Sequence, residues 1–357
     1  MHQMIKGRIS ITIFLALLLV PMLNAGCGNA RTPLPIIVAG SLMVPMEDLE
    51  AEFEQLHPDI DVQVEGHGSI QVIRQVTELG YEADVLLVAD YSLIPMMMYN
   101  ILVPNSNEPY ADWYLSFATN SLGLAYTNTS KYSDGINQSN WYEILARPDV
   151  IVGISDARLD SCGYRAFMTC QLAEDYYGNS SVFEMLFGDS FTWPVTVSLE
   201  GDVQTILVPE ILEPKGDRLV LRGNSVWLLF LLDAGEIDYA FQYRSVAEQH
   251  GYEFLEFPPE IDLSSEDLAE LYATVAVKID FQRFGSVQPE FGGESIIYGL
   301  TIPNNAPHPE LAAQFASFII SQEYGQAILL ENDQPPINPA QSDRFDSLPD
   351  EVKEELQ

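Results

Sequence analysis

Three short apolar runs alternate with two helical patterns near the start of the chain, and this alternation most constrains the fold. The apolar runs cover residues 34–39, 62–64 and 83–89, and the helical stripes between them cover 42–56 and 70–79. Strands that are linked by helices are typical of a parallel sheet covered on both faces. The pattern therefore predicts an α/β fold.

A second unit of the same kind follows a stretch of alternating apolar residues at 113–126. Its predicted elements are strands at 150–154, 219–221 and 239–241, and helices at 139–146, after Gly163 and at 225–234. Further along, residues 272–279 and 295–302 are predicted to be paired strands, and residues 309–321 a helix. The polar, proline-rich tail after Pro335 is expected to be poorly ordered.

The two units predict two lobes that are joined by crossovers, with a ligand cleft between them. A chain of 357 residues has ample material for two such domains. The predicted boundaries are a signal peptide at 1–26, a lipidated linker at 27–32, one lobe at 33–115 plus about 272–338, a second lobe at 116–271 and a polar tail at 339–357.

The first residues read as an export signal. Lys6 and Arg8 precede an apolar run at 9–23, and that run would rise only ~22 Å as a helix, short of a ~30 Å hydrocarbon core. The run ends in a segment, Leu23 to Cys27, that resembles a lipobox, so Cys27 is predicted to be lipidated. The alternative is plain cleavage nearby, with Cys27 incidental.

Composition narrows the possible functions. The formal net charge of −36 excludes most roles that need contact with a phosphate backbone, so no nucleic-acid partner is expected. With three cysteines a disulfide scaffold is not expected, and Cys162 and Cys170 would lie too far apart on one helix to bridge. Export is also compatible with three possible N-glycosylation sites, at Asn128, Asn137 and Asn179.

Two strand-to-helix turns carry a glycine followed by a serine. Gly40 precedes Ser41 in the first turn, and Gly68 precedes Ser69 in the second. Glycine allows the backbone to approach a ligand closely, and a helix start offers free N–H groups and a partial positive charge. Two such turns at one sheet edge predict an anion cradle. The alternative is that each serine only caps its helix.

The second unit offers similar positions. Asp160 stands just before a predicted helix, where an acidic residue is usually a helix cap. Facing an oxyanion, this carboxylate makes sense only if it ligates a high-valent metal centre or stays protonated. Tyr243 follows the strand at 239–241 and offers an O–H donor, unless it is simply a surface aromatic residue.

Signals for an enzyme are poor. The five histidines show no metal-binding spacing, and no nucleophile elbow, P-loop or dinucleotide motif is present. His67 beside Ser69 could suggest a base and a nucleophile, but two residues apart in one turn they are better read as loop residues. Cys162 near a helix start is better read as a small packing residue.

The sequence resembles the archaeal molybdate/tungstate-binding proteins of ABC importers, specifically the tungstate branch. The matching blocks are Ala39–Ser41, Gly68–Ser69 with Ala83–Val85, Ser155–Arg165 and Gly235–Ala247, in order between about residues 34 and 338. The resemblance implies a two-lobed, type II periplasmic-binding-protein fold. Each lobe would be a mixed sheet flanked by helices, and a tetrahedral oxyanion would be captured in the cleft between the lobes.

The resemblance also implies a set of binding residues. These are Gly40, Ser41, Ser69, Asp160 and Tyr243. Relatives tend to carry a glutamate where this chain has Ser225. Together with the aspartate, that glutamate can complete the octahedral coordination of the metal. Here Asp160 would be the only possible protein ligand to tungsten or molybdenum, and either water or a hydrogen bond from Ser225 would replace the second carboxylate. Preference among tungstate, molybdate and sulfate is therefore open.

The leading interpretation is a non-enzymatic, monomeric solute-binding protein. It would be anchored by lipid to the outer face of the cell membrane, hold no cofactor, and deliver tungstate or molybdate to an ABC permease. A second interpretation keeps the fold but changes the ligand to sulfate, phosphate or a metal chelate. A third is an exported phosphatase or esterase that uses Ser41 or Ser69, and a fourth is a surface adhesion protein.

Overall fold

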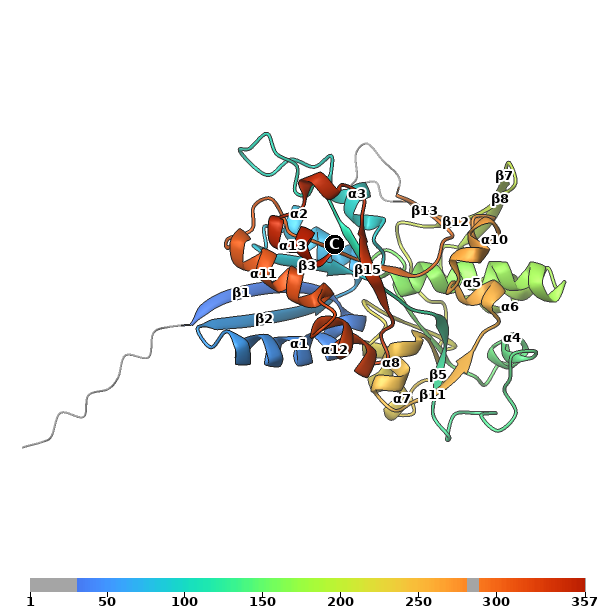
Figure 1. Ribbon diagram of the computed structural model, residues 1–357. Coiled ribbons are helices and arrows are strands. Elements are labelled where there is room, and N and C mark those ends of the chain that lie inside the picture. The colour runs from blue at the N-terminus through green and yellow to red at the C-terminus, as the bar shows by residue number, and fades with distance from the viewer. Residues whose placement is uncertain (1–30, 281–288, 357) are drawn as a thin grey trace, which may run out of the picture.

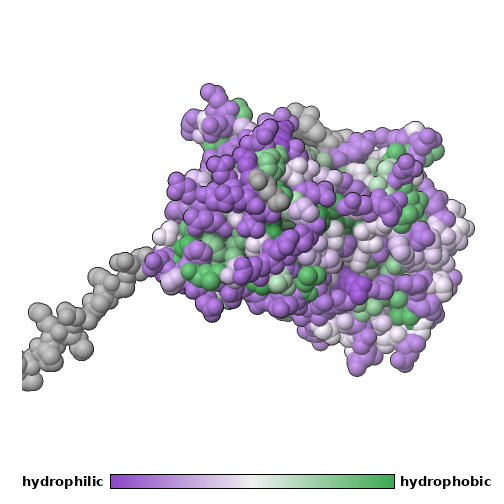
Figure 2. Space-filling model, viewed as in Figure 1, coloured by the Kyte–Doolittle hydropathy of each residue, from purple (hydrophilic) through white to green (hydrophobic). Residues whose placement is uncertain are grey.

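The computed structural model describes residues 31–280 and 289–356 of the chain. They form two lobes that lie side by side, with the N-terminal strand and the last helix in the same lobe (Figure 1). The predicted signal peptide and the lipidation site Cys27 lie outside the described residues. The face shown in Figure 2 is mainly hydrophilic, with small scattered apolar patches.

The first lobe is built on a six-stranded mixed sheet with the order β15-β4-β14-β3-β1-β2. Strand β1 pairs in parallel with β2 and β3, as the apolar runs predict. The strands are β1 (Thr32–Ala39), β2 (Ile60–His67), β3 (Val85–Val88), β4 (Leu115–Thr119), β14 (Ile297–Thr301) and β15 (Pro336–Ser342).

Helices cover both faces of this sheet. The chain moves from β1 to β2 in one direction and from β2 to β3 in the other, so right-handed crossovers place the two linking helices on opposite faces. The helices of this lobe are η1 (Gly40–Leu42), α1 (Met43–Leu56), α2 (Ser69–Thr77), α3 (Leu93–Met98), α11 (Pro309–Ile320), α12 (Gly325–Glu331), η3 (Phe345–Ser347) and α13 (Asp350–Glu355).

The second lobe contains two sheets. The five-stranded sheet has the order β11-β5-β10-β6-β9 and the four-stranded sheet has the order β13-β12-β8-β7. The strands are β5 (Leu122–Tyr126), β6 (Val152–Ser155), β7 (Thr196–Glu200), β8 (Val203–Val208), β9 (Leu219–Arg222), β10 (Tyr239–Tyr243), β11 (Glu253–Glu256), β12 (Val275–Ile279) and β13 (Glu290–Gly292).

Helix α5 (Ser161–Tyr177) is the central element of the second lobe. It contacts β5, β6 and β10 of one sheet and β8 and β12 of the other (Figure 1). Every residue from Ser161 to Ala173 is buried. The other helices are α4 (Trp141–Leu145), α6 (Val182–Phe187), α7 (Trp227–Asp233), α8 (Arg244–Gln249), α9 (Pro259–Asp262), η2 (Glu266–Leu268) and α10 (Ala269–Tyr272).

Within residues 31–280 and 289–356, two crossovers join the lobes, at residues 120–121 and 293–296. Sheet membership places these crossovers later than the predicted boundaries at 115 and about 272. Strand β12 was expected to pair with the strand at 295–302, but it pairs with β8 and β13, whereas β14 pairs with β3 and β4. The apolar pattern shows that a segment is a strand but does not show which sheet it joins.

The C-terminal tail is ordered, contrary to the sequence-based prediction. It was expected to be poorly ordered, but residues 336–342 form edge strand β15 against β4, and α13 packs on α11. Val352 and Leu348 are buried, and this apolar contact orders an otherwise polar segment.

Three smaller predictions concern the cysteines, the glycosylation sites and membrane-spanning helices. Cys162 and Cys170 are both buried and free, as the helical spacing predicted. Asn128 and Asn137 are exposed in the loop before α4 and Asn179 is partly buried, so glycosylation at these positions stays a prediction. Within the described part of the chain, no helix is both long and apolar enough to cross a bilayer.

Candidate functional site

The two glycine–serine turns lie at the C-terminal ends of β1 and β2. Ser41 lies in η1 and Ser69 is the first residue of α2, and both side chains are buried. Neither serine is the N-cap residue of its helix, because Ala39 and Gly68 occupy those positions. The two hydroxyls instead accept hydrogen bonds from Tyr298 and from the Ala89 amide. The serines therefore serve some purpose other than simple helix capping.

The turn at Gly68 is also where the lobes meet. A Cβ atom on Gly68 would lie 2.5 Å from the carbonyl oxygen of Leu159 and 2.9 Å from Cβ of Asp160, so only glycine fits here. The amides of Ile70 and Gln71 donate to the Leu159 oxygen at 3.0 and 3.1 Å. The first turn of α2 is thus hydrogen-bonded to the second lobe, and the cleft is closed.

Three hydroxyl groups from the two lobes lie next to each other inside this closed cleft. Oγ of Ser161 lies 3.2 Å from Oγ of Ser69 and 3.0 Å from the hydroxyl of Tyr243. All three residues are at most 1% exposed. The structure therefore brings Ser69 and Tyr243, which the sequence singled out, to either side of Ser161, which it did not.

A second hydroxyl pair continues the polar surface on the first lobe. The Tyr298 hydroxyl donates to Oγ of Ser41 at 3.0 Å, and Nδ2 of Asn120 donates to the Tyr298 oxygen at 3.0 Å. The rings of Tyr298 and Tyr243 are 6.2 Å apart, centre to centre. Ser41 thus joins the same buried region through Tyr298, a residue that the sequence reasoning missed.

Asp160 lies just before α5 and is 4% exposed. Its side chain makes no cap hydrogen bond to the helix; instead Oδ2 accepts a hydrogen bond from the Ser225 amide at 3.0 Å. Burial raises the pKa of this carboxyl group, and hydrogen bonds that include the amides of Ser225 and Ser69 partly offset the rise. A desolvated carboxylate beside hydroxyl donors is unusual unless it has a ligand to bind.

The remaining two predicted residues lie on either side of the lobe contact. Gly40 faces the second lobe, where an added Cβ atom would lie 3.4 Å from Cγ2 of Val226 and 3.5 Å from Cγ of Asn224. Ser225 is 3% exposed, and its carbonyl oxygen accepts a hydrogen bond from Gln242 at 3.0 Å. The structure therefore places all six predicted positions at the junction of the lobes.

An arginine that sequence reasoning missed lies behind the hydroxyls. Nη1 of Arg165 donates to the Tyr243 hydroxyl at 2.8 Å and to the Ala89 carbonyl at 2.6 Å. Its Nη2 atom lies 3.3 Å from Oδ2 of Asp90, which also accepts a hydrogen bond from the Tyr164 hydroxyl. This buried ion pair links α5 to the first lobe.

Both members of this ion pair left a signal in the sequence. Arg165 follows Ser161 by four residues, and this spacing places both side chains on one face of a helix. Asp90 comes shortly after the third strand of the parallel set, at the sheet edge where Ser41 and Ser69 lie. The rule that singled out the first two strand ends applies equally to the third.

Two enzyme-like alternatives find no support at this site. Nε2 of His67 lies 2.7 Å from a carboxylate oxygen of Glu65, and the hydroxyl of Ser69 contacts Ser161 and the amide of Ala89 instead. Burial raises the pKa of the Cys162 thiol, which favours the unreactive protonated form.

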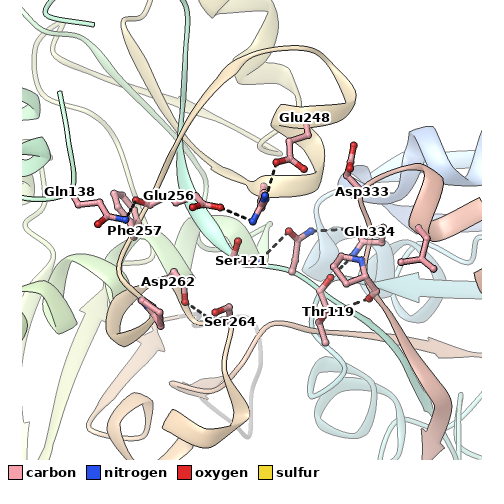
Figure 3. Close-up of a pocket in the computed structure, with 15 residues that line it drawn as sticks. Thr119, Ser121, Gln138, Glu248, Glu256, Phe257, Asp262, Ser264, Asp333 and Gln334 are labelled. Atoms are coloured by element: carbon pink, nitrogen blue, oxygen red, sulfur yellow. Dashed lines mark hydrogen bonds and ion pairs between the residues drawn. The ribbon is translucent and has the colours of Figure 1, made fainter. Parts of the chain in front are cut away.

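A separate, open pocket of about 590 Å³ lies beside the crossover at 120–121 (Figure 3). Arg244 is paired there with Glu248 and Glu256, and Asp262 and Asp333 add two more carboxyl groups. Burial raises the pKa of Asp262 to about 6. This excess of carboxylates disfavours an anionic ligand, so the closed cleft is the stronger candidate.

The comparisons with known proteins identify the family. A family model described as bacterial extracellular solute-binding protein matches residues 34–332. The chain belongs to this family. A solute-binding protein from Methanoculleus marisnigri is 45% identical over 307 residues, which are 86% of this chain and 82% of that protein.

Two further relatives carry a more specific name. The molybdate/tungstate-binding protein WtpA of Pyrococcus abyssi is 38% identical, and the alignment covers 91% of this chain and 90% of that protein. The protein of the same name from Thermococcus kodakarensis is 37% identical, with 92% and 89% covered.

Solved structures show the same solute-binding fold. The periplasmic molybdate-binding protein of Azotobacter vinelandii aligns with a TM-score of 0.52 at 14% identity, covering 84% of this chain and 98% of that chain. The sulfate-binding protein SubI of Mycobacterium tuberculosis aligns with a TM-score of 0.52 at 12% identity, covering 87% and 88%. These likenesses confirm the periplasmic-binding-protein fold predicted from the sequence.

Proposed function

We propose that this solute-binding protein captures tungstate or molybdate outside the cytoplasm and delivers it to the permease of an ABC importer. The observation that carries the proposal is that hydroxyls from both lobes are buried together. Ser41 and Ser69 come from one lobe and Ser161 and Tyr243 from the other. Hydroxyl and amide donors held in a water-excluded site are suited to an oxyanion.

Two further observations support this ligand class. Relatives at 37–38% identity are named molybdate/tungstate-binding proteins. The buried carboxyl group of Asp160 would repel a sulfate dianion, but it could ligate a metal that can expand its coordination, as tungsten and molybdenum can. The proposed binding residues are Gly40, Ser41, Ser69, Asp160, Ser225 and Tyr243.

The site would hold the metal of the anion through Asp160 alone. The resemblance to tungstate-binding proteins implies that Ser225 replaces a second carboxylate, which would complete an octahedron around the metal. In the structure the Ser225 amide donates to Asp160. We infer that Ser225 contributes hydrogen bonds rather than a metal ligand, which would lower the advantage of tungstate over sulfate. Sulfate binding is therefore the second candidate function, and the fold likeness to a sulfate-binding protein is compatible with it.

Calorimetric titration of the mature chain with tungstate, molybdate, sulfate and phosphate tests the proposal. We expect tungstate and molybdate to bind more tightly than sulfate, and phosphate to bind most weakly. The absence of binding heat with all four anions would exclude an oxyanion-binding function. Binding of sulfate alone would favour the second candidate.

We also propose that the protein works as a monomer, without a cofactor, at the outer face of the cell membrane through a lipid on Cys27. The short apolar run and the lipobox-like segment before Cys27 support this location. Mass spectrometry of the native protein is expected to show a lipid-modified N-terminus at Cys27. An unmodified N-terminus downstream of Cys27 would contradict it.

A further inference from the structure

The hydroxyl chain Ser69–Ser161–Tyr243 holds more protons than it can use internally. It has two hydrogen-bonded contacts, at 3.2 Å and 3.0 Å, but its three hydroxyl groups carry three protons. One proton is therefore left over, and it must be donated to a group outside the chain or stay unpaired in a buried site.

Both ends of this chain are closed by groups that can only donate. The amide of Ala89 donates to Oγ of Ser69 at 3.0 Å, and Nη1 of Arg165 donates to the Tyr243 hydroxyl at 2.8 Å. Neither an amide N–H nor a guanidinium can accept a hydrogen bond in return. Within the described residues, the other hydrogen bonds to these three hydroxyl groups come from these two donors. The third hydroxyl proton is therefore available to a ligand.

The hydroxyl oxygen of Ser41 also accepts a hydrogen bond from a donor behind it. Asn120 donates to the Tyr298 oxygen, and the Tyr298 hydroxyl in turn donates to Oγ of Ser41 at 3.0 Å. The oxygen of Ser41 therefore receives a hydrogen bond, and its own proton is left for a ligand. In each lobe, neighbouring donors thus occupy hydroxyl oxygens, and this leaves hydroxyl protons free to be donated to a ligand.

Arg165 is the charged member of this arrangement. It is 2% exposed, and the Ala89 carbonyl and the Asp90 carboxylate, both from the first lobe, hold its guanidinium in place. A guanidinium does not deprotonate in proteins, so its hydrogen bond to Tyr243 cannot reverse. It also crosses the lobe junction, so the bond pattern at Tyr243 depends on lobe closure.

We propose that Arg165 is a positioning residue for anion binding: by donating to Tyr243, it commits the hydroxyl chain to donation toward the ligand. The inference rests on the proposed oxyanion function. A site with this polarity favours an anion that carries no proton, such as tungstate, over one that must itself donate, such as hydrogen phosphate. Without Arg165, the free lone pair of Tyr243 can accept a hydrogen bond from the P–OH group of such an anion.

Titration of three proteins with tungstate and with phosphate at neutral pH tests the proposal. Arg165→Met is expected to lose about 10- to 100-fold in tungstate affinity, the range for a hydrogen bond to a charged group, and to lose less for phosphate. Arg165→Lys keeps a donor and a charge, and it should recover part of the loss. Arg147→Met is the control, because this exposed arginine stacks on Tyr132 and is not among the proposed binding or positioning residues, and it should bind as the wild type does.

A double-mutant cycle separates positioning from a purely structural role. In a Tyr243→Phe background there is no hydroxyl to orient, so adding Arg165→Lys or Arg165→Met should cost far less tungstate affinity than in the wild type. An equal cost in both backgrounds would overturn the inference, and so would wild-type affinity in Arg165→Met. If Arg165→Met does not fold, the Lys variant carries the cycle. Wild-type protein that binds none of the anions would instead overturn the proposed function.

Discussion

Two carboxylates are buried where the lobes meet, and their partners differ. Asp90 is 2% exposed, lies 3.3 Å from the guanidinium of Arg165 and accepts hydrogen bonds from Tyr164 and Ser92. Asp160 is 4% exposed and accepts the Ser225 amide, but no lysine or arginine among the described residues lies within ion-pair distance of it.

The difference teaches how to tell a structural charge from a functional one. Burying a charge is costly, and the cost is offset when the chain supplies a counter-charge and hydrogen bonds. The charge of Asp90 is balanced within the protein. The carboxyl group of Asp160 is hydrogen-bonded but has no paired cation, and burial raises its pKa. A buried carboxyl group without a paired cation is therefore expected to contact a bound ligand.

The largest expected effect is a difference in protein stability between substitutions of the two carboxylates. Asp90→Ala would leave the buried guanidinium of Arg165 without its counter-charge, and should cost about 3–5 kcal/mol in the free energy of unfolding. Asp160→Asn removes a desolvated charge and should change that free energy by about 1 kcal/mol or less, or raise it. Urea unfolding of the ligand-free proteins measures both. Equal losses would show that Asp160 is as structural as Asp90.

The next effect sharpens the role of Asp160 in selectivity. Ser225→Glu would add the second carboxylate and should widen the tungstate-to-sulfate affinity ratio by about tenfold, or ~1.4 kcal/mol. Asp160→Asn removes the possible metal ligand and should shrink the ratio. Competition titrations at fixed high salt keep charge screening equal among the variants. An unchanged ratio in Ser225→Glu would mean that residue 225 does not reach the metal.

The two serine hydroxyls of the first lobe should each contribute less. Ser41→Ala and Ser69→Ala are each expected to weaken tungstate binding by ~1–3 kcal/mol, the usual range for a hydrogen bond to a charged group. Thr169→Ala is a matched control: it also removes a buried hydroxyl, but that hydroxyl donates to Ile261 in the second lobe. Titration of the three variants tests this. Unchanged affinity in both serine variants would mean that these hydroxyls do not bind the anion.

The smallest effect concerns a third carboxyl group, Glu294, in the crossover next to Asp90. Burial, and then the charge of Asp90, raise its pKa to about 7. The folded state therefore holds this proton more tightly than the unfolded chain, whose glutamates titrate near ~4.3. Its stabilising contribution is present below about pH 4 and is lost as the pH rises toward about 7, with a slope of at most ~1.4 kcal/mol per pH unit.

The pH effect is measured by unfolding the ligand-free protein at several values between pH 4 and 8. Glu294→Gln carries no titrating group and should flatten the decline that the wild type shows in this window. Tyr91 donates to Glu294 at 2.8 Å, and an amide oxygen can still accept that bond. A variant as pH-dependent as the wild type would assign the decline to other groups.

Much of the first lobe could be predicted from sequence because its signals are local. The apolar runs correctly gave β1, β2 and β3, and the C-terminal ends of parallel strands meet at one edge, which brought Ser41 and Ser69 together. The same logic placed Asp160 and Tyr243 at strand ends of the second lobe. Their roles as ligand-binding residues remain proposals.

The missed features depend on contacts between distant segments. Nothing local shows that β12 joins β8, or that the polar tail becomes a sheet edge beside β4. Tyr298 lies within a strand, and only the position of β14 next to β4 shows which buried residues it faces. Asp90 is the exception, because its place after β3 follows the rule that was applied to the other two strand ends.

The closed cleft has a kinetic consequence. The proposed binding hydroxyls are at most 4% exposed, so an anion cannot leave without the lobes parting. Release can then be no faster than opening, and the residence time of the cargo is set by the motion of whole lobes rather than by the breaking of one bond. For a transport protein this separates two tasks: the closed protein retains the solute, and delivery requires that the lobes open.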